Sequence, residues 1–226
     1  MNGRLSGLSS MATRHILADL ARDYEASHGT RVEIRSMGGV EAAKSVRAGE
    51  ATDIVVLASK VMASLETEGH LVKSGTRDFA RSEIGVAVRA GSALPSLASE
   101  QAVKQAMLDA RKICYSTGPS GDHLKALCEK WAIPLTRTLV APPGAPVATL
   151  VANGDAELGF QQLSELIGQP GIEVVGPLPP EIQAVTVFSA GISTMSLDPE
   201  GARAFVAYLV SVETEKAKRR HGMEPA

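Results

Sequence analysis

The feature that most constrains the fold is the unbroken apolar run Ile-Val-Val-Leu-Ala at residues 54–58. A strand with one face in water alternates apolar and polar residues, whereas a strand in a parallel sheet with both faces covered does not. Segments with helical spacing of apolar residues precede and follow the run, at residues 41–48 and 61–68. The pattern predicts an α/β fold in which a mostly parallel sheet is flanked by helices.

The same alternation extends along the rest of the chain, and it begins again after residue 90. It predicts strands at residues 30–36, 84–88, 112–115, 158–160 and 173–175. It predicts helices at residues 10–29, 99–110, 122–131, 147–152 and 200–218.

Composition excludes several classes of function. The formal net charge is −2 and aromatic residues make up 4%, so no basic field or stacking surface draws the chain to nucleic acid or to an anionic membrane. Cys114 and Cys128 are too few for a disulfide framework or a four-cysteine zinc site. The five histidines lack metal-ligand spacing. We therefore expect no metal, no cofactor and no nucleic-acid partner.

Candidate ligand-binding residues lie where predicted strands end, because parallel sheets bind ligands beyond the carboxyl ends of their strands. They combine hydroxyl, glycine and amide residues. The candidates are Ser9, Ser10, Thr13, Gly38, Gly39, Ser116, Thr117, Ser120, Gly121, Gln161 and Gln162.

The segment at residues 116–121 follows a predicted strand and opens a predicted helix. Its hydroxyls and the free backbone N–H groups of the helix start suit an anion, or the segment is a capped turn that binds nothing. The hydroxyls of Ser9, Ser10 and Thr13 present the same two alternatives. Gly38 and Gly39 either let the backbone approach a ligand closely or form a turn that requires positive φ.

Two glutamines follow the predicted strand at residues 158–160. Because successive strand residues face opposite sides, we expect one of Gln161 and Gln162 to point inward and the other outward. A buried glutamine needs hydrogen-bond partners, which either a ligand or the backbone can supply. His123 lies early in the helix after the 116–121 segment. It is the candidate catalytic residue, with a plain surface role as the alternative.

With these residues in view, the chain resembles the periplasmic molybdate-binding protein family of the type II solute-binding fold, over nearly its whole length. The order and spacing of several moderately specific motifs carry the resemblance. They are Ala48-Gly49 leading to Asp53, TDIVVLAS at 52–59, LETEGHL at 65–71, FARS at 79–82, GDAELGF at 154–160, VGPLP at 175–179, and the end of the chain from Tyr208 to Pro225.

The resemblance implies two α/β lobes: residues 1–80 plus 188–226, and residues 81–187, with a ligand cleft between them and hinge closure. The family holds its tetrahedral oxyanion with two serines, a backbone N–H and a tyrosine. Ser10 matches the first serine and Ser120 the backbone position. The second serine falls at Gly38 or Gly39, and the tyrosine falls at Gln162. These departures favour a larger organic di- or tricarboxylate over molybdate.

The resemblance thus implies a protein that binds a small anion, either such a carboxylate or a molybdate-like oxyanion. Bacterial aconitate isomerase is similar to the same family, so the alternative is an isomerase that moves an allylic proton on an unsaturated carboxylate. Residues 1–7 carry one positive charge and no apolar stretch, so we expect a cytoplasmic location. If a signal has been removed, a periplasmic location and an ABC-transporter membrane component as partner are expected instead.

Overall fold

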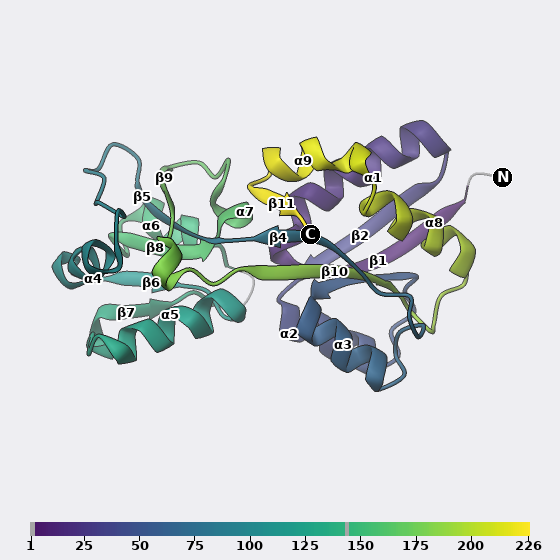
Figure 1. The fold of residues 1–226 in the computed structure, drawn as a ribbon, viewed down its shortest axis with the longest axis horizontal. Helices are drawn as coiled ribbons and strands as arrows, with labels where there is room; N and C mark the ends of the chain where they lie inside the picture. The colour runs from purple at the N-terminus through teal and green to yellow at the C-terminus, as the bar shows by residue number, and fades with distance from the viewer. Residues whose placement is uncertain (1–2, 143–144) are drawn as a thin grey trace. The chain divides into compact units, whose positions relative to one another are not determined.

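A computed structural model describes residues 3–142 and 145–226, and it divides the chain into two compact units. Unit 1 contains the chain up to Ser82 together with Val187–Ala226, and unit 2 contains Glu83–Thr186. The polypeptide therefore passes between the units twice, after Ser82 and after Thr186. Within the described residues, each unit contains one sheet with its helices (Figure 1).

In unit 1 the sheet has the strand order β11-β4-β10-β3-β1-β2. Its strands are β1 (Arg4–Ser10), β2 (Arg31–Met37), β3 (Ile54–Ala58), β4 (Arg77–Ser82), β10 (Thr186–Ile192) and β11 (Met223–Pro225). Its helices are α1 (Arg14–His28), α2 (Gly39–Arg47), α3 (Ser59–Thr67), α8 (Pro199–Leu209) and α9 (Glu215–Arg220). Short 3-10 turns at Met11–Thr13 and Val212–Thr214 precede α1 and α9.

In unit 2 the sheet has the strand order β7-β6-β8-β5-β9. Its strands are β5 (Ile84–Arg89), β6 (Ile113–Tyr115), β7 (Thr138–Val140), β8 (Leu158–Gln162) and β9 (Ile172–Pro177). Its helices are α4 (Glu100–Asp109), α5 (Pro119–Lys130), α6 (Val147–Asn153) and α7 (Leu163–Leu166). Two 3-10 turns occupy Leu135–Arg137 and Pro180–Ile182.

The apolar run that begins at Ile54 forms β3, and both of its faces are covered as the sequence predicts. Ile54 and Val56 pack with α1 and α8, while Val55 and Leu57 pack with α2 and α3 on the opposite face (Figure 1). All four side chains are almost completely buried. The α/β architecture with helices on both faces of a sheet is confirmed.

Both sheets are mixed. In unit 1, β1 pairs in parallel with β2 and β3, but β10 is antiparallel to β3 and β11 is antiparallel to β4. In unit 2, β6 pairs in parallel with β7 and β8, while β5 is antiparallel to both β8 and β9. β5 and β10 are the strands next to the two passages between the units, so the antiparallel pairings arise where the chain enters or leaves a sheet. Because neighbouring parallel strands run in the same direction, their carboxyl ends lie at the same edge of the sheet.

Two sequence predictions at the ends of the chain are corrected. Residues 4–10 form β1, and helix α1 begins only at Arg14, after a 3-10 turn, rather than at residue 10. The helix predicted at residues 200–218 ends at Leu209, and α9 is separate. There the Thr214 hydroxyl donates to the Leu209 carbonyl at 3.0 Å and so satisfies one of the carbonyls that the end of α8 leaves free.

The carboxylate of Asp53 ties three segments of unit 1 together. One oxygen accepts the backbone N–H of Ser6 at 2.8 Å and its hydroxyl at 2.9 Å. The other accepts the Ser196 hydroxyl at 2.8 Å and the backbone N–H groups of Leu197 and Asp198. Burial alone would raise the pKa of Asp53, but these hydrogen bonds outweigh it and hold the pKa below its usual value.

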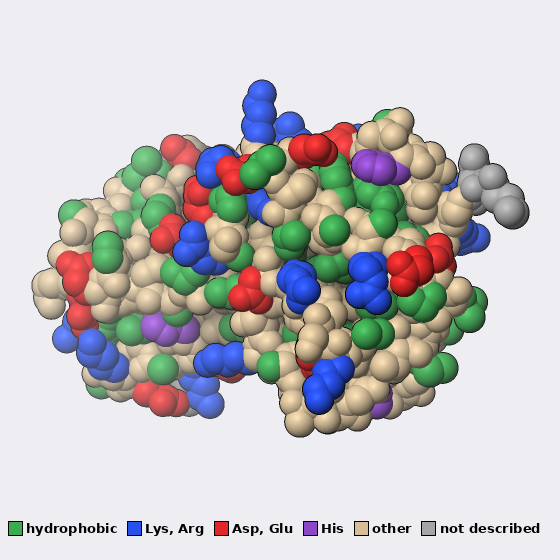
Figure 2. Space-filling view, turned by 45° about the vertical axis from the view of Figure 1, so that its right-hand side comes forward, with side chains coloured by type: hydrophobic (Ala, Val, Ile, Leu, Met, Phe, Trp, Pro, Cys, Tyr) green, Lys and Arg blue, Asp and Glu red, His purple; other side chains and the backbone are tan. Residues whose placement is uncertain are grey.

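Charged side chains of both signs are interspersed on the face shown in Figure 2. This distribution agrees with the small net charge of the whole sequence. Within residues 3–142 and 145–226, none of the helices combines the length and the apolar character that crossing a bilayer requires.

We predict that Asp53→Asn lowers the free energy of unfolding by about 3 kcal/mol at pH 7, because it removes charge-assisted hydrogen bonds from a buried group. Since the pKa is lowered in the folded state, this contribution is complete above the unfolded value of about 3.9 and is lost as pH falls below it. Urea unfolding between pH 3 and pH 7 measures the effect. Asp155→Asn, at an exposed position, is the control and should be nearly neutral. Equal stability of wild type and Asp53→Asn at pH 7 would contradict the analysis.

Candidate functional site

The ends of β1 and β2 in unit 1 bring four of the predicted residues together. The parallel register places Ser9 opposite Ser36 and Ser10 opposite Met37, so both strands end at the same level. Gly38 and Gly39 follow β2 directly and start α2. A Cβ built on Gly39 would lie 3.9 Å from the Cβ of Ser10, so the Ser10 side chain lies beside the start of α2.

The hydroxyls at this edge differ in how fully they are engaged. Ser9 Oγ lies 2.8 Å from Ser36 Oγ and 3.3 Å from the Ser10 carbonyl oxygen, and Thr13 Oγ1 donates to that carbonyl at 3.0 Å. Ser10 Oγ has only a 3.5 Å contact with Thr13 Oγ1, and it does not cap the turn that follows. Ser10 is therefore the hydroxyl with the most hydrogen-bonding capacity left.

The two glycines after β2 are not explained by backbone conformation. Gly38 has φ −55° and ψ 136°, values open to any residue, so the prediction of a turn that needs positive φ is wrong here. A Cβ on Gly38 would meet nothing within 4 Å. Because these two glycines have no side chains, open space remains beside Ser10 and beside the first N–H groups of α2. Those N–H groups have no acceptor within the helix.

In unit 2 the segment after β6 forms a comparable helix start. The helix begins at Pro119 and not at residue 122, because proline suits the first helical position, so Ser120 and Gly121 lie in the first turn. Ser120 is buried and its Oγ lies 3.3 Å from Ser116 Oγ. Gly118 has φ +94°, a conformation that favours glycine, and Thr117 is exposed.

Gly121 is required by packing. A Cβ there would lie 1.7 Å from the Ser116 carbonyl oxygen, so only glycine lets the first turn of α5 pack against the loop. We predict that Gly121→Ala lowers the free energy of unfolding by about 3 kcal/mol through overpacking. Gly38→Ala, into open space, should change it by less than about 1 kcal/mol. Urea denaturation of the two variants tests this, and equal effects would show that the close contact at Gly121 is not what demands glycine.

The two glutamines end β8, and both are buried at 3% exposure, so the expectation that one points outward is wrong. Gln161 is fully engaged: its Oε1 accepts the backbone N–H of Val147 at 3.2 Å, and its Nε2 donates to Glu165 at 2.7 Å. Gln162 Nε2 donates to the Thr186 hydroxyl at 2.8 Å, but its Oε1 has no hydrogen-bond partner among the described residues.

His123 is held by the fold. Its Nε2 lies 2.7 Å from the carbonyl oxygen of Ile182, so the ring joins α5 to the turn at Pro180–Ile182. That contact gives the histidine a structural partner, and its catalytic assignment stays a prediction. No cluster of three or more His, Cys, Asp or Glu side chains suited to a metal ion occurs in the part of the chain that the structure describes.

Sequence patterns missed some polar residues at the strand ends. Thr186, the partner of Gln162, is the first residue of β10 and carries no local sequence signal of its role. Ser59, the first residue of α3, follows β3, whose neighbour in the sheet is β1. Its position directly after the apolar run at residues 54–58 is a signal that could have identified it.

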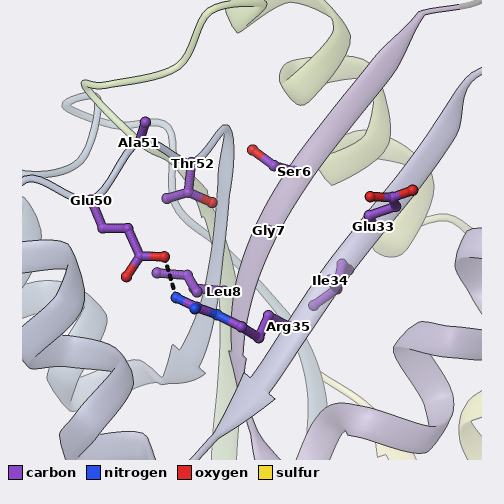
Figure 3. Close-up of a pocket in the computed structure, with 9 residues that line it drawn as sticks. All are labelled: Ser6, Gly7, Leu8, Glu33, Ile34, Arg35, Glu50, Ala51 and Thr52. Atoms are coloured by element: carbon purple, nitrogen blue, oxygen red, sulfur yellow. Dashed lines mark hydrogen bonds and ion pairs between the residues drawn. The ribbon is translucent and has the colours of Figure 1, made fainter.

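A separate hollow of about 430 Å³ opens on unit 1 beside β1 and β2. Figure 3 shows Arg35 extending from β2 towards Glu50, with which it forms an ion pair. The lining residues are Ser6, Gly7, Leu8, Glu33, Ile34, Arg35, Glu50, Ala51 and Thr52. None of the candidate residues predicted from the sequence is among them, so this hollow is distinct from the strand-end cluster.

Comparison with known proteins adds sequence evidence. The family of bacterial extracellular solute-binding proteins matches residues 5–224. An aconitate isomerase from Pseudomonas sp. is 33% identical over 230 residues, covering 98% of this chain and 87% of that protein.

Solved structures agree in fold. The periplasmic molybdate-binding protein of Azotobacter vinelandii superposes with a TM-score of 0.79 at 19% identity, covering 97% of this chain and 98% of that one. A substrate-binding domain assigned to a molybdenum ABC transporter of Clostridium difficile gives a TM-score of 0.74 at 17% identity, and both chains are covered completely. The type II periplasmic-binding-protein fold predicted from the sequence is confirmed.

Proposed function

The chain belongs to the family of bacterial extracellular solute-binding proteins, and from this premise we propose that it binds a small organic di- or tricarboxylate through donors at the carboxyl ends of its parallel strands. The resemblance seen in the sequence is confirmed at the level of the family. Membership of this family supports solute binding, and the choice of ligand rests on the residues of this chain.

The family description also bears on location and partner. It denotes extracellular proteins, which agrees with the periplasmic alternative and gives no support to the cytoplasmic expectation. We propose that this chain delivers its ligand to the membrane component of an ABC transporter, as the domain from Clostridium difficile is assigned to do.

The observation that carries the binding proposal is the open backbone at Gly38 and Gly39 beside the hydroxyl of Ser10. The first N–H groups of α2 and the positive end of its dipole attract an anion without any charged side chain. The missing Cβ atoms let a carboxylate approach these N–H groups directly. Serine in place of glycine would supply a further donor but would narrow the opening.

Unit 2 offers a second set of donors of the same kind. The first turn of α5 carries buried Ser120 next to Ser116, and its free N–H groups lie at the end of β6. Gln162, at the end of the neighbouring β8, contributes an amide whose Oε1 is unpartnered. Where the molybdate-binding family has a tyrosine hydroxyl, this chain offers an amide oxygen, which is an acceptor, and this disfavours a ligand such as molybdate that has only acceptor oxygens.

The test is a thermal-shift panel of cis- and trans-aconitate, citrate, shorter dicarboxylates, molybdate, tungstate, sulfate and phosphate. A ligand at a hundred times its Kd stabilises the folded state by about 2.7 kcal/mol, which shifts Tm measurably. We expect the carboxylates to raise Tm. Ser10→Ala should weaken their binding about tenfold, the loss of one hydrogen bond, whereas Ser27→Ala, exposed on α1, should not. A response to molybdate or tungstate alone would contradict the choice of ligand class.

The relative named aconitate isomerase favours a second candidate function, an allylic proton shift on an unsaturated tricarboxylate. This reaction requires a base near the carbon that loses its proton and donors that stabilise the enolate-like charge. The N–H groups and hydroxyls of Ser10 and Ser120 are suited to the second task. His123 is the candidate for the first.

The isomerase candidate predicts that purified protein converts cis-aconitate to its trans isomer, which proton NMR follows through the vinyl signal. His123→Gln should abolish turnover while binding persists, if the ring is the base. Unchanged turnover in that variant would remove His123 from the mechanism. Binding of aconitate without any conversion would leave the protein a receptor.

A further inference from the structure

Three glutamines of unit 2, of which Gln161 and Gln162 are buried and Gln183 is half-buried, differ in how fully their amides are hydrogen-bonded. Gln183 Oε1 accepts the backbone N–H groups of Ile84 and Ala184, each at 2.9 Å, and its Nε2 donates to two carbonyl oxygens. Gln161 is likewise bonded through both ends of its amide. Gln162 uses only its Nε2, towards Thr186. Ser211 Oγ is the other fully buried side-chain polar atom without a partner among residues 3–142 and 145–226.

The position of this unpartnered oxygen is informative. Gln162 is the last residue of β8, whose parallel neighbour β6 leads into the helix start that carries Ser120. An amide oxygen shielded from water and without a donor is destabilising, so such atoms are rare in folded proteins. Their presence at the ligand-binding end of a sheet indicates that the donor comes from the ligand.

We propose that Gln162 Oε1 accepts a hydrogen bond from a hydroxyl group of the ligand, so that the ligand is a hydroxy-substituted carboxylate. This inference rests on the proposed function and narrows its ligand class. Carboxylate, sulfate and molybdate oxygens only accept hydrogen bonds at neutral pH, and an amide oxygen repels them. A hydroxyl donates, and its carbon skeleton still carries the carboxylates that the helix starts bind.

Thr186 is the positioning residue for this contact. Its hydroxyl accepts from Gln162 Nε2 at 2.8 Å, which leaves the amide oxygen for the ligand. A ligand without the hydroxyl leaves the buried oxygen unpaired in the complex, and we expect it to bind much more weakly. Gln162 and Thr186 together therefore determine the preference for a hydroxylated ligand.

The test uses two ligand pairs that each differ by a single hydroxyl: citrate with tricarballylate, and malate with succinate. Isothermal titration of the whole chain should show the hydroxylated member binding at least about tenfold more tightly. Gln162→Met keeps the length of the side chain but removes the acceptor, and it should reduce the preference to about one. Thr186→Val should reduce the preference in part. Gln105→Met, exposed on α4, is the matched control and should leave it unchanged.

The outcomes separate this inference from the proposed function. If both members of a pair bind equally, the inference is overturned and carboxylate binding stands. If tricarballylate binds more tightly and Gln162→Met weakens it, the amide presents its N–H₂ group instead, which also overturns the inference. If no carboxylate binds, both fail. Should Gln162→Met not fold, the comparison of ligand pairs on the wild-type chain decides alone.

Discussion

The architecture of unit 1 depends on the buried carboxylate of Asp53, which stands directly before β3. Its oxygens hold β1 through Ser6 and the segment leading into α8 through residues 196–198. Asp198 in turn caps α8 by accepting the backbone N–H of Gly201 at 2.9 Å. A single charged group thus fixes the relative register of two parallel strands and the start of a helix that covers them.

The register of these parallel strands determines which residues meet at the carboxyl edge of the sheet. Because β1, β2 and β3 are parallel and in register, the residues after each strand share one edge of the sheet. Short connections then place helix starts there, with N–H groups that lack intrahelical acceptors. Hydroxyls and glycines at this edge therefore offer hydrogen-bond donors to the anion that we propose as the ligand, without a lysine or arginine. The partial charges of the backbone N–H groups at these helix starts do not titrate, so the attraction that we propose does not depend on the protonation of a side chain.

The sequence predicts most of this arrangement where patterns are strong. The apolar run at residues 54–58 identifies a doubly covered strand, and the 116–121 segment is found as a helix start because a strand, glycines and a proline mark it. β1 was missed because Arg4–Ser10 contains mostly serine, glycine and arginine, so only its pairing with β2 and β3 makes it a strand. β4, with the sequence RDFARS, is missed because its two apolar residues are adjacent and so show no strand alternation.

The polar details of the candidate site depend on contacts between residues distant in sequence, which periodicity does not encode. Gln161 and Gln162 look alike in the sequence, yet one is bound to the start of α6 and the other has a free oxygen. The positive φ expected after β2 is absent, because Gly38 caps α2 in an extended conformation. Glycine there is explained by the space it leaves and not by the turn it makes.

In the function that we propose, backbone donors at the strand ends bind the carboxylate. The most direct measurement is a ¹⁵N–¹H correlation spectrum of the chain titrated with citrate. We expect saturable shifts of the amide signals of Gly38 and Gly39, together with those in the first turn of α5. Shifts confined to the hollow between Arg35 and Glu50, or no saturable shifts at all, would contradict it.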